Sequence, residues 1–194
     1  MRPLVLHTLP AALLLTRVLC ALASSAQLHA QPQPQPPPLW PLPSSSSSGG
    51  GSPRVLGGGA GALSFSATSG DSDELQLAIA RYTAIIFARG GHTAAAAAGP
   101  TVCRISVAHP VKALGMGTDE GYSLRVPASG DVTINATTTI GAYRALETLS
   151  QLIAYDFDHG GRYVIDRVPW AIDDAPRFPW RGLMIDTARR ESVL

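Results

Sequence analysis

The chain has 194 residues, of which 45% are hydrophobic and 15% are charged, and its formal net charge at pH 7 is +1. This length predicts one or two small domains. The charges are balanced and the arginines are scattered, which excludes the dense basic surface that binding to nucleic acid requires. The 19 glycines and 16 prolines indicate that a substantial part of the chain has no regular structure.

We expect residues 1–23 to be a secretory signal peptide. Arg2 supplies the positive charge that precedes a mainly apolar segment, residues 4–15, and residues 21–23 form a small-x-small cleavage site. The apolar segment is too short to span a membrane comfortably, so no membrane is expected as a partner and an uncleaved anchor is the alternative. A signal peptide predicts the secretory pathway, and then an extracellular location or a lysosome- or vacuole-like compartment.

Residues 24–61 are of low complexity. They contain repeated Gln-Pro, a serine run from Ser44 to Ser48 and clustered glycines. This composition offers few apolar side chains to offset the entropy cost of ordering, so the segment is predicted to be disordered, with Leu39-Trp40-Pro41 as the exception. A proline-rich ligand for a partner protein is the alternative to a plain linker.

Residues 62–169 are predicted to form an α+β domain. Helices are expected at 71–89 and 139–155, because apolar residues recur there three and four positions apart. Asp71, with Glu74 three residues later, has the spacing of a capping box. Alternating apolar residues predict strands in residues 62–66, 102–107, 120–126, 132–136 and 163–168. This order of elements predicts a mainly antiparallel sheet with the two helices on one face.

The mature chain is expected to keep one cysteine. Cys20 would leave with the signal peptide, so Cys103 would have no partner for an internal disulfide. Cys103 is predicted to be buried in the strand at 102–107, where its thiol would be unreactive. In an oxidising compartment, the alternative is an exposed thiol that pairs with another molecule.

The C-terminal stretch begins with residues that interrupt regular structure. An Asp-Asp pair and two prolines, Pro176 and Pro179, predict an extended connector over residues 175–180, because proline fixes φ and removes an amide donor. The short apolar run at 182–185 then predicts a strand buried on both faces.

Three stretches closely resemble the β-N-acetylhexosaminidases of glycoside hydrolase family 20, in their eukaryotic form. The sequence Asp-Asp-Ala-Pro-Arg-Phe-Pro-Trp-Arg-Gly-Leu-Met-Ile-Asp-Thr-Ala-Arg at 173–189 resembles the linker and first barrel strand of that family, and residues 119–124 and 139–152 resemble its N-terminal domain. The resemblance implies that residues 170–194 are a linker and the first strand of a (β/α)8 catalytic barrel. Because the remaining strands do not follow, we expect a truncated chain, through a premature stop, an alternative transcript or a faulty gene model.

Within this resemblance, Arg189 matches the arginine that binds hydroxyl groups of the terminal N-acetylhexosamine of a glycan. A planar guanidinium can donate to two neighbouring oxygens at once. Asp186 lies three positions earlier and is expected to orient Arg189; the alternative is an arginine exposed on a frayed terminus. Arg181 matches an arginine of structural role, which packs the linker against the barrel.

No catalytic residue is predicted in this chain. The family removes terminal β-linked N-acetylhexosamine by substrate-assisted retaining hydrolysis, with an adjacent Asp-Glu pair. Asp119-Glu120 matches a different part of the family, so it is interpreted as a solvated turn before a strand. Asp173-Asp174 is interpreted as a linker signal that helps to neutralise Arg177. The chain alone is therefore expected to be inactive, and the alternative function is a non-catalytic secreted α+β domain that binds a partner or a full-length subunit.

Asn135-Ala136-Thr137 is a sequon for N-linked glycosylation in a secreted chain. The sequence implies no cofactor, and no metal site, because His92, His109 and His159 are dispersed without further ligands at metal-binding spacing. The partners that the resemblance implies are an N-acetylhexosamine-terminated glycan and a second subunit in a dimer.

Overall fold

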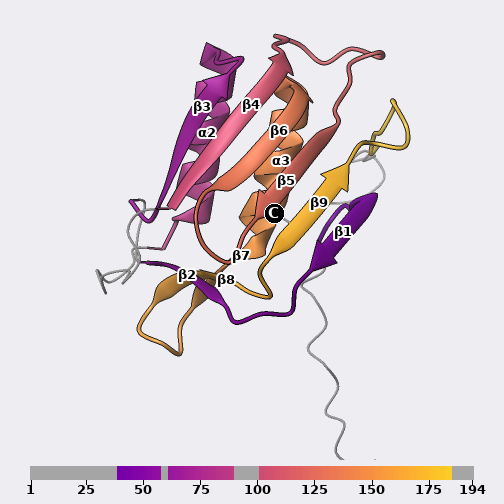
Figure 1. The fold of residues 1–194 in the computed structure, drawn as a ribbon. Coiled ribbons are helices and arrows are strands. Elements are labelled where there is room, and N and C mark those ends of the chain that lie inside the picture. Colours follow the sequence, from indigo (N-terminus) through magenta and orange to yellow (C-terminus); the bar gives the residue numbers. More distant parts are fainter. Residues whose placement is uncertain (1–38, 58–60, 90–100, 185–194) are drawn as a thin grey trace, which may run out of the picture. The chain divides into compact units, whose positions relative to one another are not determined.

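The computed structural model describes residues 39–57, 61–89 and 101–184 of the chain (Figure 1). These residues belong to one compact unit, Pro37–Leu194. The predicted signal peptide at 1–23 lies outside the described residues. No helix among the described residues has both the length and the apolar character needed to cross a membrane.

A six-stranded sheet forms the centre of this unit, and its strands follow the order β1-β9-β5-β6-β4-β3. Their bounds are Ser45–Ser48 (β1), Trp170–Asp174 (β9), Tyr122–Val126 (β5), Val132–Thr138 (β6), Thr101–His109 (β4) and Leu63–Ser69 (β3). Neighbours from β1 to β6 are antiparallel, whereas β6, β4 and β3 are parallel. The pair β3-β4 is parallel because helix α2 (Asp73–Ile86) connects the two strands as a crossover.

A second sheet has three strands, in the order β2-β8-β7. Their bounds are Arg54–Gly57 (β2), Arg162–Ile165 (β8) and Ile153–Asp156 (β7). Both of its pairings are antiparallel. Among the described residues, five of the seven strand pairings in the two sheets are therefore antiparallel, which confirms the predicted α+β class with a mainly antiparallel sheet.

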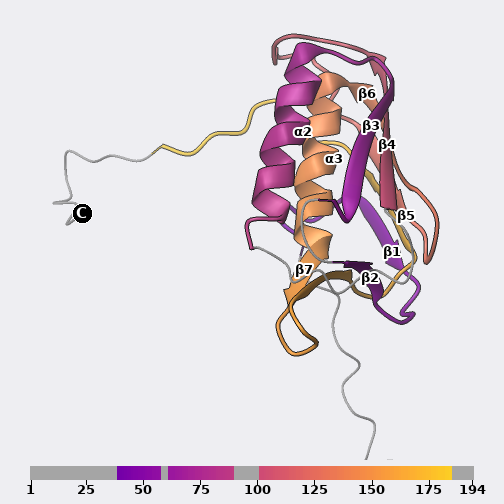
Figure 2. The ribbon, with the colours of Figure 1, turned by 90° about the vertical axis from the view of Figure 1, so that its left-hand side faces the viewer.

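Helices α2 and α3 (Thr139–Leu152) lie side by side on one face of the six-stranded sheet, as predicted (Figure 2). A hydroxyl oxygen caps the start of each helix. Oγ of Ser72 accepts from the backbone N of Leu75 at 3.2 Å, and Oγ1 of Thr138 accepts from N of Gly141 at 3.3 Å. Each cap satisfies one amide that the first turn of a helix leaves without a partner.

The ends of the two helices differ from the prediction. Asp71 does not cap α2, because its carboxylate accepts from Nε2 of Gln76 at 2.7 Å, whereas Ser72 has the extended backbone of a cap residue. Helix α3 ends at Leu152 rather than at Tyr155, because Ile153–Asp156 leaves the helix to pair with β8.

The core lies between the six-stranded sheet and the helices. Alternate residues of the inner strands β9, β5, β6 and β4 are buried against the helices, among them Leu124 in β5 and Ile134 in β6, together with Leu146 of α3. Burying a side chain of this size stabilises the fold by about 1.5–3 kcal/mol. Cys103 in β4 is also buried, as predicted, and this burial raises the pKa of its thiol to about 12, so the reactive thiolate is scarce at neutral pH.

Two strands lie in the segment that is predicted to be disordered, residues 24–61. The strand β1 pairs along its whole length with β9, and β2 pairs with β8. The prediction is wrong for these residues because backbone hydrogen bonds can hold an edge strand, and a serine run forms them as well as an apolar run does. The contact continues beyond β1, since N of Gly49 donates to O of Pro169 at 2.8 Å.

The C-terminal linker begins later than predicted. Trp170–Asp174 forms β9, an inner strand between β1 and β5, and its residues Trp170 and Ile172 are buried in the core. Residues 175–184, which we call the connector, then follow without helix or strand. The described part of the expected barrel strand, residues 182–184, has no strand neighbour among the described residues, and a strand forms only when its backbone groups are paired.

Candidate functional site

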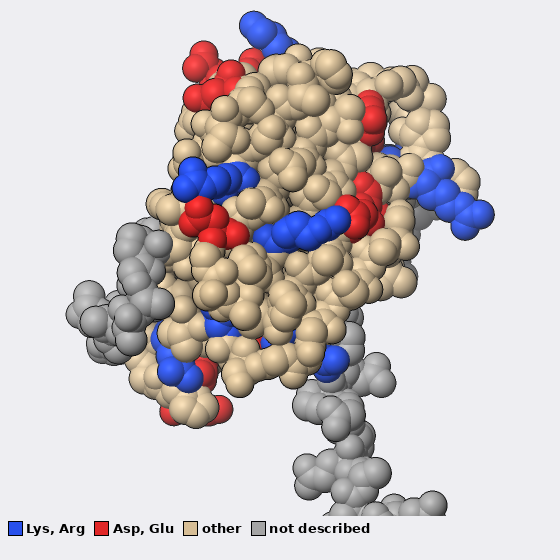
Figure 3. All heavy atoms as spheres, viewed as in Figure 1, with Lys and Arg blue, Asp and Glu red and all other residues tan. Residues whose placement is uncertain are grey.

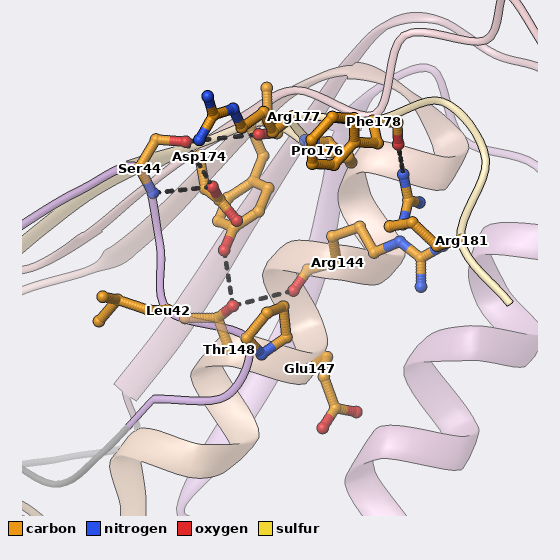
Figure 4. Close-up of a pocket in the computed structure, with 13 residues that line it drawn as sticks. Leu42, Ser44, Arg144, Glu147, Thr148, Asp174, Pro176, Arg177, Phe178 and Arg181 are labelled. Carbon is orange, nitrogen blue, oxygen red and sulfur yellow. Dashed lines mark hydrogen bonds between the residues drawn. The ribbon is translucent and has the colours of Figure 1, made fainter. Parts of the chain in front are cut away.

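The residues that are predicted to bind and position a sugar, Arg189 and Asp186, lie outside the described residues. The described residues form a different site, which the sequence did not predict. Three charged side chains from distant parts of the chain, Glu120, Arg144 and Arg181, meet there. The two arginines also line a cavity, as Figure 4 shows. We call these three residues the arginine-carboxylate cluster.

Glu120 lies at the centre of the cluster, and only 4% of its side chain is exposed. Nη2 of Arg181 donates to both carboxylate oxygens, at 2.6 and 2.7 Å. Nε of Arg144 donates to Oε2 at 2.8 Å. The interpretation of Asp119-Glu120 as a solvated turn is therefore wrong for Glu120, because two guanidinium groups replace the water that a buried carboxylate loses.

Local contacts bring the start of α3 close to Glu120. Oγ1 of Thr138 donates to the carbonyl oxygen of Asp119 at 2.5 Å. Gly141 in the first turn permits this approach, because a Cβ there would lie 2.5 Å from the carbonyl oxygen of Gly121. Arg144, one turn further along the helix, thereby reaches the Glu120 carboxylate.

Arg181 folds the connector onto the domain. Besides its bidentate contact with Glu120, its Nη1 donates to the carbonyl oxygen of Phe178 at 2.6 Å. Arg181 therefore joins the connector to Glu120, just before β5, and Glu120 in turn binds Arg144 of α3. This contact gives Arg181 the structural role that the resemblance implied, although its described partner is the α+β domain rather than a barrel.

The two aspartates before the connector do not neutralise Arg177, contrary to the prediction. Asp173 accepts from Nη2 of Arg125 with both carboxylate oxygens at 2.8 Å. Oδ1 of Asp174 accepts from N and Oγ of Ser44, at 2.9 and 3.0 Å. The guanidinium of Arg177 instead lies over the ring of Phe178, with Cζ 5.6 Å from the ring centroid. Asp173 thus links β9 to the inner strand β5, and Asp174 links β9 to the residue before the edge strand β1.

A cavity of about 470 Å³ lies next to the cluster (Figure 4). The segment before β1, helix α3 and the connector line it, together with Tyr122 of β5 and Asp174 of β9. The lining residues are Pro41, Leu42, Ser44, Tyr122, Arg144, Glu147, Thr148, Asp174, Ala175, Pro176, Arg177, Phe178 and Arg181. The hydroxyls of Tyr122 and Thr148 lie 2.6 Å apart in a hydrogen bond, and burial raises the pKa of Tyr122 to about 12.

The electrostatics of the cluster favour an anchor over an acid catalyst. Burial raises the pKa of Glu120, but the hydrogen bonds and positive charges of Arg181 and Arg144 outweigh this effect, so the pKa lies below its ordinary value. The general acid of a glycosidase needs the opposite shift, because it must hold a proton near neutral pH.

Among residues 39–57, 61–89 and 101–184, no group of three or more His, Cys, Asp or Glu side chains could hold a metal ion.

The comparison with known proteins identifies the family. A profile described as "beta-acetyl hexosaminidase like" matches residues 39–152, which is more than half of the chain. The chain belongs to this family. The matched segment contains β1 to α3, including Glu120 and Arg144, so the carboxylate and the first arginine of the cluster lie in the hexosaminidase-like domain itself.

The individual proteins to which the chain is similar are also hexosaminidases or a chitobiase by name. The chain is 38% identical over 120 residues to Beta-hexosaminidase subunit B2 of Dictyostelium discoideum, covering 61% of this chain and 21% of the relative. It is 42% identical over 95 residues to Beta-hexosaminidase 1 of Arabidopsis thaliana, covering 46% of this chain and 17% of the relative. Among solved structures, the chitobiase of Flavobacterium johnsoniae is 25% identical with a TM-score of 0.53, covering 75% of this chain and 22% of the chitobiase. The hexosaminidase-like chain thus spans about a fifth of the length of these relatives.

Proposed function

We propose that this chain provides the N-terminal domain of a secreted β-N-acetylhexosaminidase, and that its cluster fixes the path of the connector into the catalytic barrel. The enzyme would remove terminal β-linked N-acetylhexosamine from glycans by substrate-assisted retaining hydrolysis, the reaction that the resemblance implies. The 194-residue chain alone would be inactive, because Glu120, the one buried Asp or Glu side chain within residues 39–57, 61–89 and 101–184, is held ionised by two arginines.

The observation that carries this proposal is the contrast within the connector. Arg181 is tied to a buried carboxylate, while the apolar side chains around it are exposed to solvent. Their exposed fractions are 62% for Phe178, 76% for Trp180, 87% for Leu183 and 91% for Met184. A run of large exposed apolar residues indicates a surface that another domain covers. A barrel that follows the connector would cover it at a position fixed by Arg181.

In this proposal, Arg189 binds hydroxyl groups of the terminal sugar and Asp186 orients it. Arg181 lies eight residues before Arg189 and would act as a positioning residue, since it sets where the connector leaves the domain. Displacing a substrate-binding group by about 1 Å can lower activity by about two orders of magnitude. The cluster is thus expected to affect catalysis without touching the substrate.

A chimera tests the proposal. Residues 39–184 would replace the matching segment of Beta-hexosaminidase 1 of Arabidopsis thaliana, and hydrolysis of a chromogenic N-acetyl-β-glucosaminide would be measured beside the 194-residue chain. We expect activity from the chimera and none from the chain alone. The variant Arg181→Gln in the chimera should lower kcat, whereas Arg177→Gln, also in the connector but outside the cluster, is the matched control.

Three results would count against this function. Hydrolysis by the 194-residue chain alone would mean that it holds its own catalytic groups. A chimera that folds but is inactive would favour the alternative, a non-catalytic secreted domain that binds a partner or a full-length subunit. Equal activities of the Arg181→Gln and Arg177→Gln chimeras would mean that the cluster does not position the barrel.

A further inference from the structure

The face of the six-stranded sheet opposite the helices is covered by neither α2 nor α3 (Figure 2). We call it the open face. Strand residues that point to it are mostly short and polar, and they include Ser106, Ser123, Thr133 and Thr137. None of the large apolar side chains that are exposed in the described residues belongs to a strand of this sheet. Figure 3 views this side of the molecule and shows basic and acidic side chains adjoining each other in pairs.

Asn135 lies near the centre of this open face. It is in β6, an inner strand, and its side chain is exposed. Its cross-strand neighbours are Ser106 in β4 and Ser123 in β5. The side chains directly opposite Asn135 are therefore short, in agreement with its exposure. The amide makes no side-chain hydrogen bond with any residue that the structure describes.

Asn135 is also the only asparagine of the chain, and Ala136 and Thr137 complete its sequon. We propose that Asn135 carries an N-linked glycan, and that this glycan keeps the open face in solvent. The inference rests on the secretory targeting in the proposed function, because N-glycosylation takes place in that pathway. A bulky hydrophilic glycan is compatible with this polar face and would be incompatible with the apolar core on the opposite side of the same strand.

The modification is a group transfer from a lipid diphosphate-linked oligosaccharide. Nδ2 of Asn135 forms a bond to C1 of the first sugar while the bond between C1 and the diphosphate oxygen breaks. The lipid diphosphate leaves with the electron pair of the broken bond, and the proton that Nδ2 loses balances the negative charge on its oxygen. The chain contributes the acceptor amide and the Thr137 hydroxyl of the sequon.

Intact mass measurement tests the site. The full 194-residue chain is expressed in eukaryotic cells, recovered from the medium and weighed before and after treatment with peptide N-glycosidase. We expect a glycan mass that the enzyme removes, with conversion of Asn135 to Asp in the corresponding peptide. The glycan should be absent from Asn135→Gln and Thr137→Ala and present in Thr137→Ser. Thr133→Ala, on the same face of the same strand but outside the sequon, is the matched control and should keep it.

A secreted chain with the mass of the unmodified polypeptide would overturn the proposal. If the chain is not secreted, a second version is made in which an established secretory leader replaces residues 1–38. This version tests glycosylation of Asn135 separately from the predicted signal peptide. A glycan on that version would support the site and contradict the predicted signal peptide. Absence of a glycan on that version, once secreted, would overturn the site.

Discussion

The two faces of the six-stranded sheet are made from the same strands and differ because side chains alternate along each strand. Toward the helices, Leu124, Ile134 and Ile172 are fully buried. Toward the open face, Arg125 and Asp173 form an exposed ion pair. The face toward the helices therefore forms the buried core of the domain, and the open face is polar and exposed to solvent. A further domain would therefore dock through the connector, where Phe178, Trp180, Leu183 and Met184 are exposed close together in sequence.

The largest expected effect comes from the buried side of the sheet. Leu146→Ala should lower the free energy of unfolding of the 194-residue chain by about 2–5 kcal/mol, because it removes a fully buried side chain and leaves a cavity. Thr133→Ala on the open face is the matched control and should change it by about 0.5 kcal/mol or less. Urea denaturation followed by circular dichroism would measure both. Similar losses for the two variants would contradict the difference between the faces.

An intermediate effect is expected at the arginine-carboxylate cluster. Glu120→Gln should lower the free energy of unfolding by about 1–3 kcal/mol, because it weakens charge-assisted hydrogen bonds at a buried site whose two arginines are partly exposed. It should also release the connector, so that trypsin cleaves after Arg177 or Arg181 at a higher rate. Unchanged cleavage kinetics would mean that the cluster does not hold the connector.

The arginine-carboxylate cluster should also make the stability difference between the wild-type chain and Glu120→Gln depend on pH. The pKa of Glu120 lies below its ordinary value in the folded chain, because Arg181 and Arg144 donate to its carboxylate, so the ionised form stabilises the fold. Its contribution should be fully present above the unfolded-state pKa, which is about 4.3 for a glutamate, and should be lost as the pH falls through the lower folded-state pKa. Wild-type chain and Glu120→Gln should therefore differ in Tm at neutral pH and converge in acid. A constant difference in Tm from neutral pH down to acid pH would be inconsistent with this linkage.

The smallest effect is expected on the open face. Arg125→Gln removes an ion pair to Asp173 in which 43% and 55% of the two side chains are exposed, so it should cost about 0–1 kcal/mol. Added salt should reduce the difference further, because exposed charges are screened. A loss as large as that of Leu146→Ala would show that this face is packed against something in solution.

The helices and the central strands could be predicted because each shows its own periodicity. In β5, Tyr122, Leu124 and Val126 alternate with exposed positions, and α3 repeats apolar residues three and four apart. The edge strand β1 could not be predicted in this way, because its serines carry no apolar pattern. Its partner β9 could not be predicted either, because the two aspartates at its end indicated a linker, although Trp170 and Ile172 alternate as buried residues of a strand do.

The cluster was missed for a different reason. Arg144 lies 24 residues from Glu120, and Arg181 lies 61 residues from it. No local pattern connects positions so far apart, and an acidic residue before a strand is ordinarily solvated. The signal that remained was the match of Arg181 to a structural arginine of the family, which indicated that it has a fixed partner without identifying that partner.

The position of β9 has a consequence for the order in which the domain is made. This strand is the last of the sheet in sequence, yet it lies between β1 and β5. Until the ribosome has released residues 170–174, β5 has an unpaired edge and β1, already synthesised, has no neighbour. The sheet therefore closes late and joins segments about 130 residues apart, as the bond from Ser44 to Asp174 illustrates. During synthesis, the growing chain would depend on being shielded from other chains until that final strand arrives.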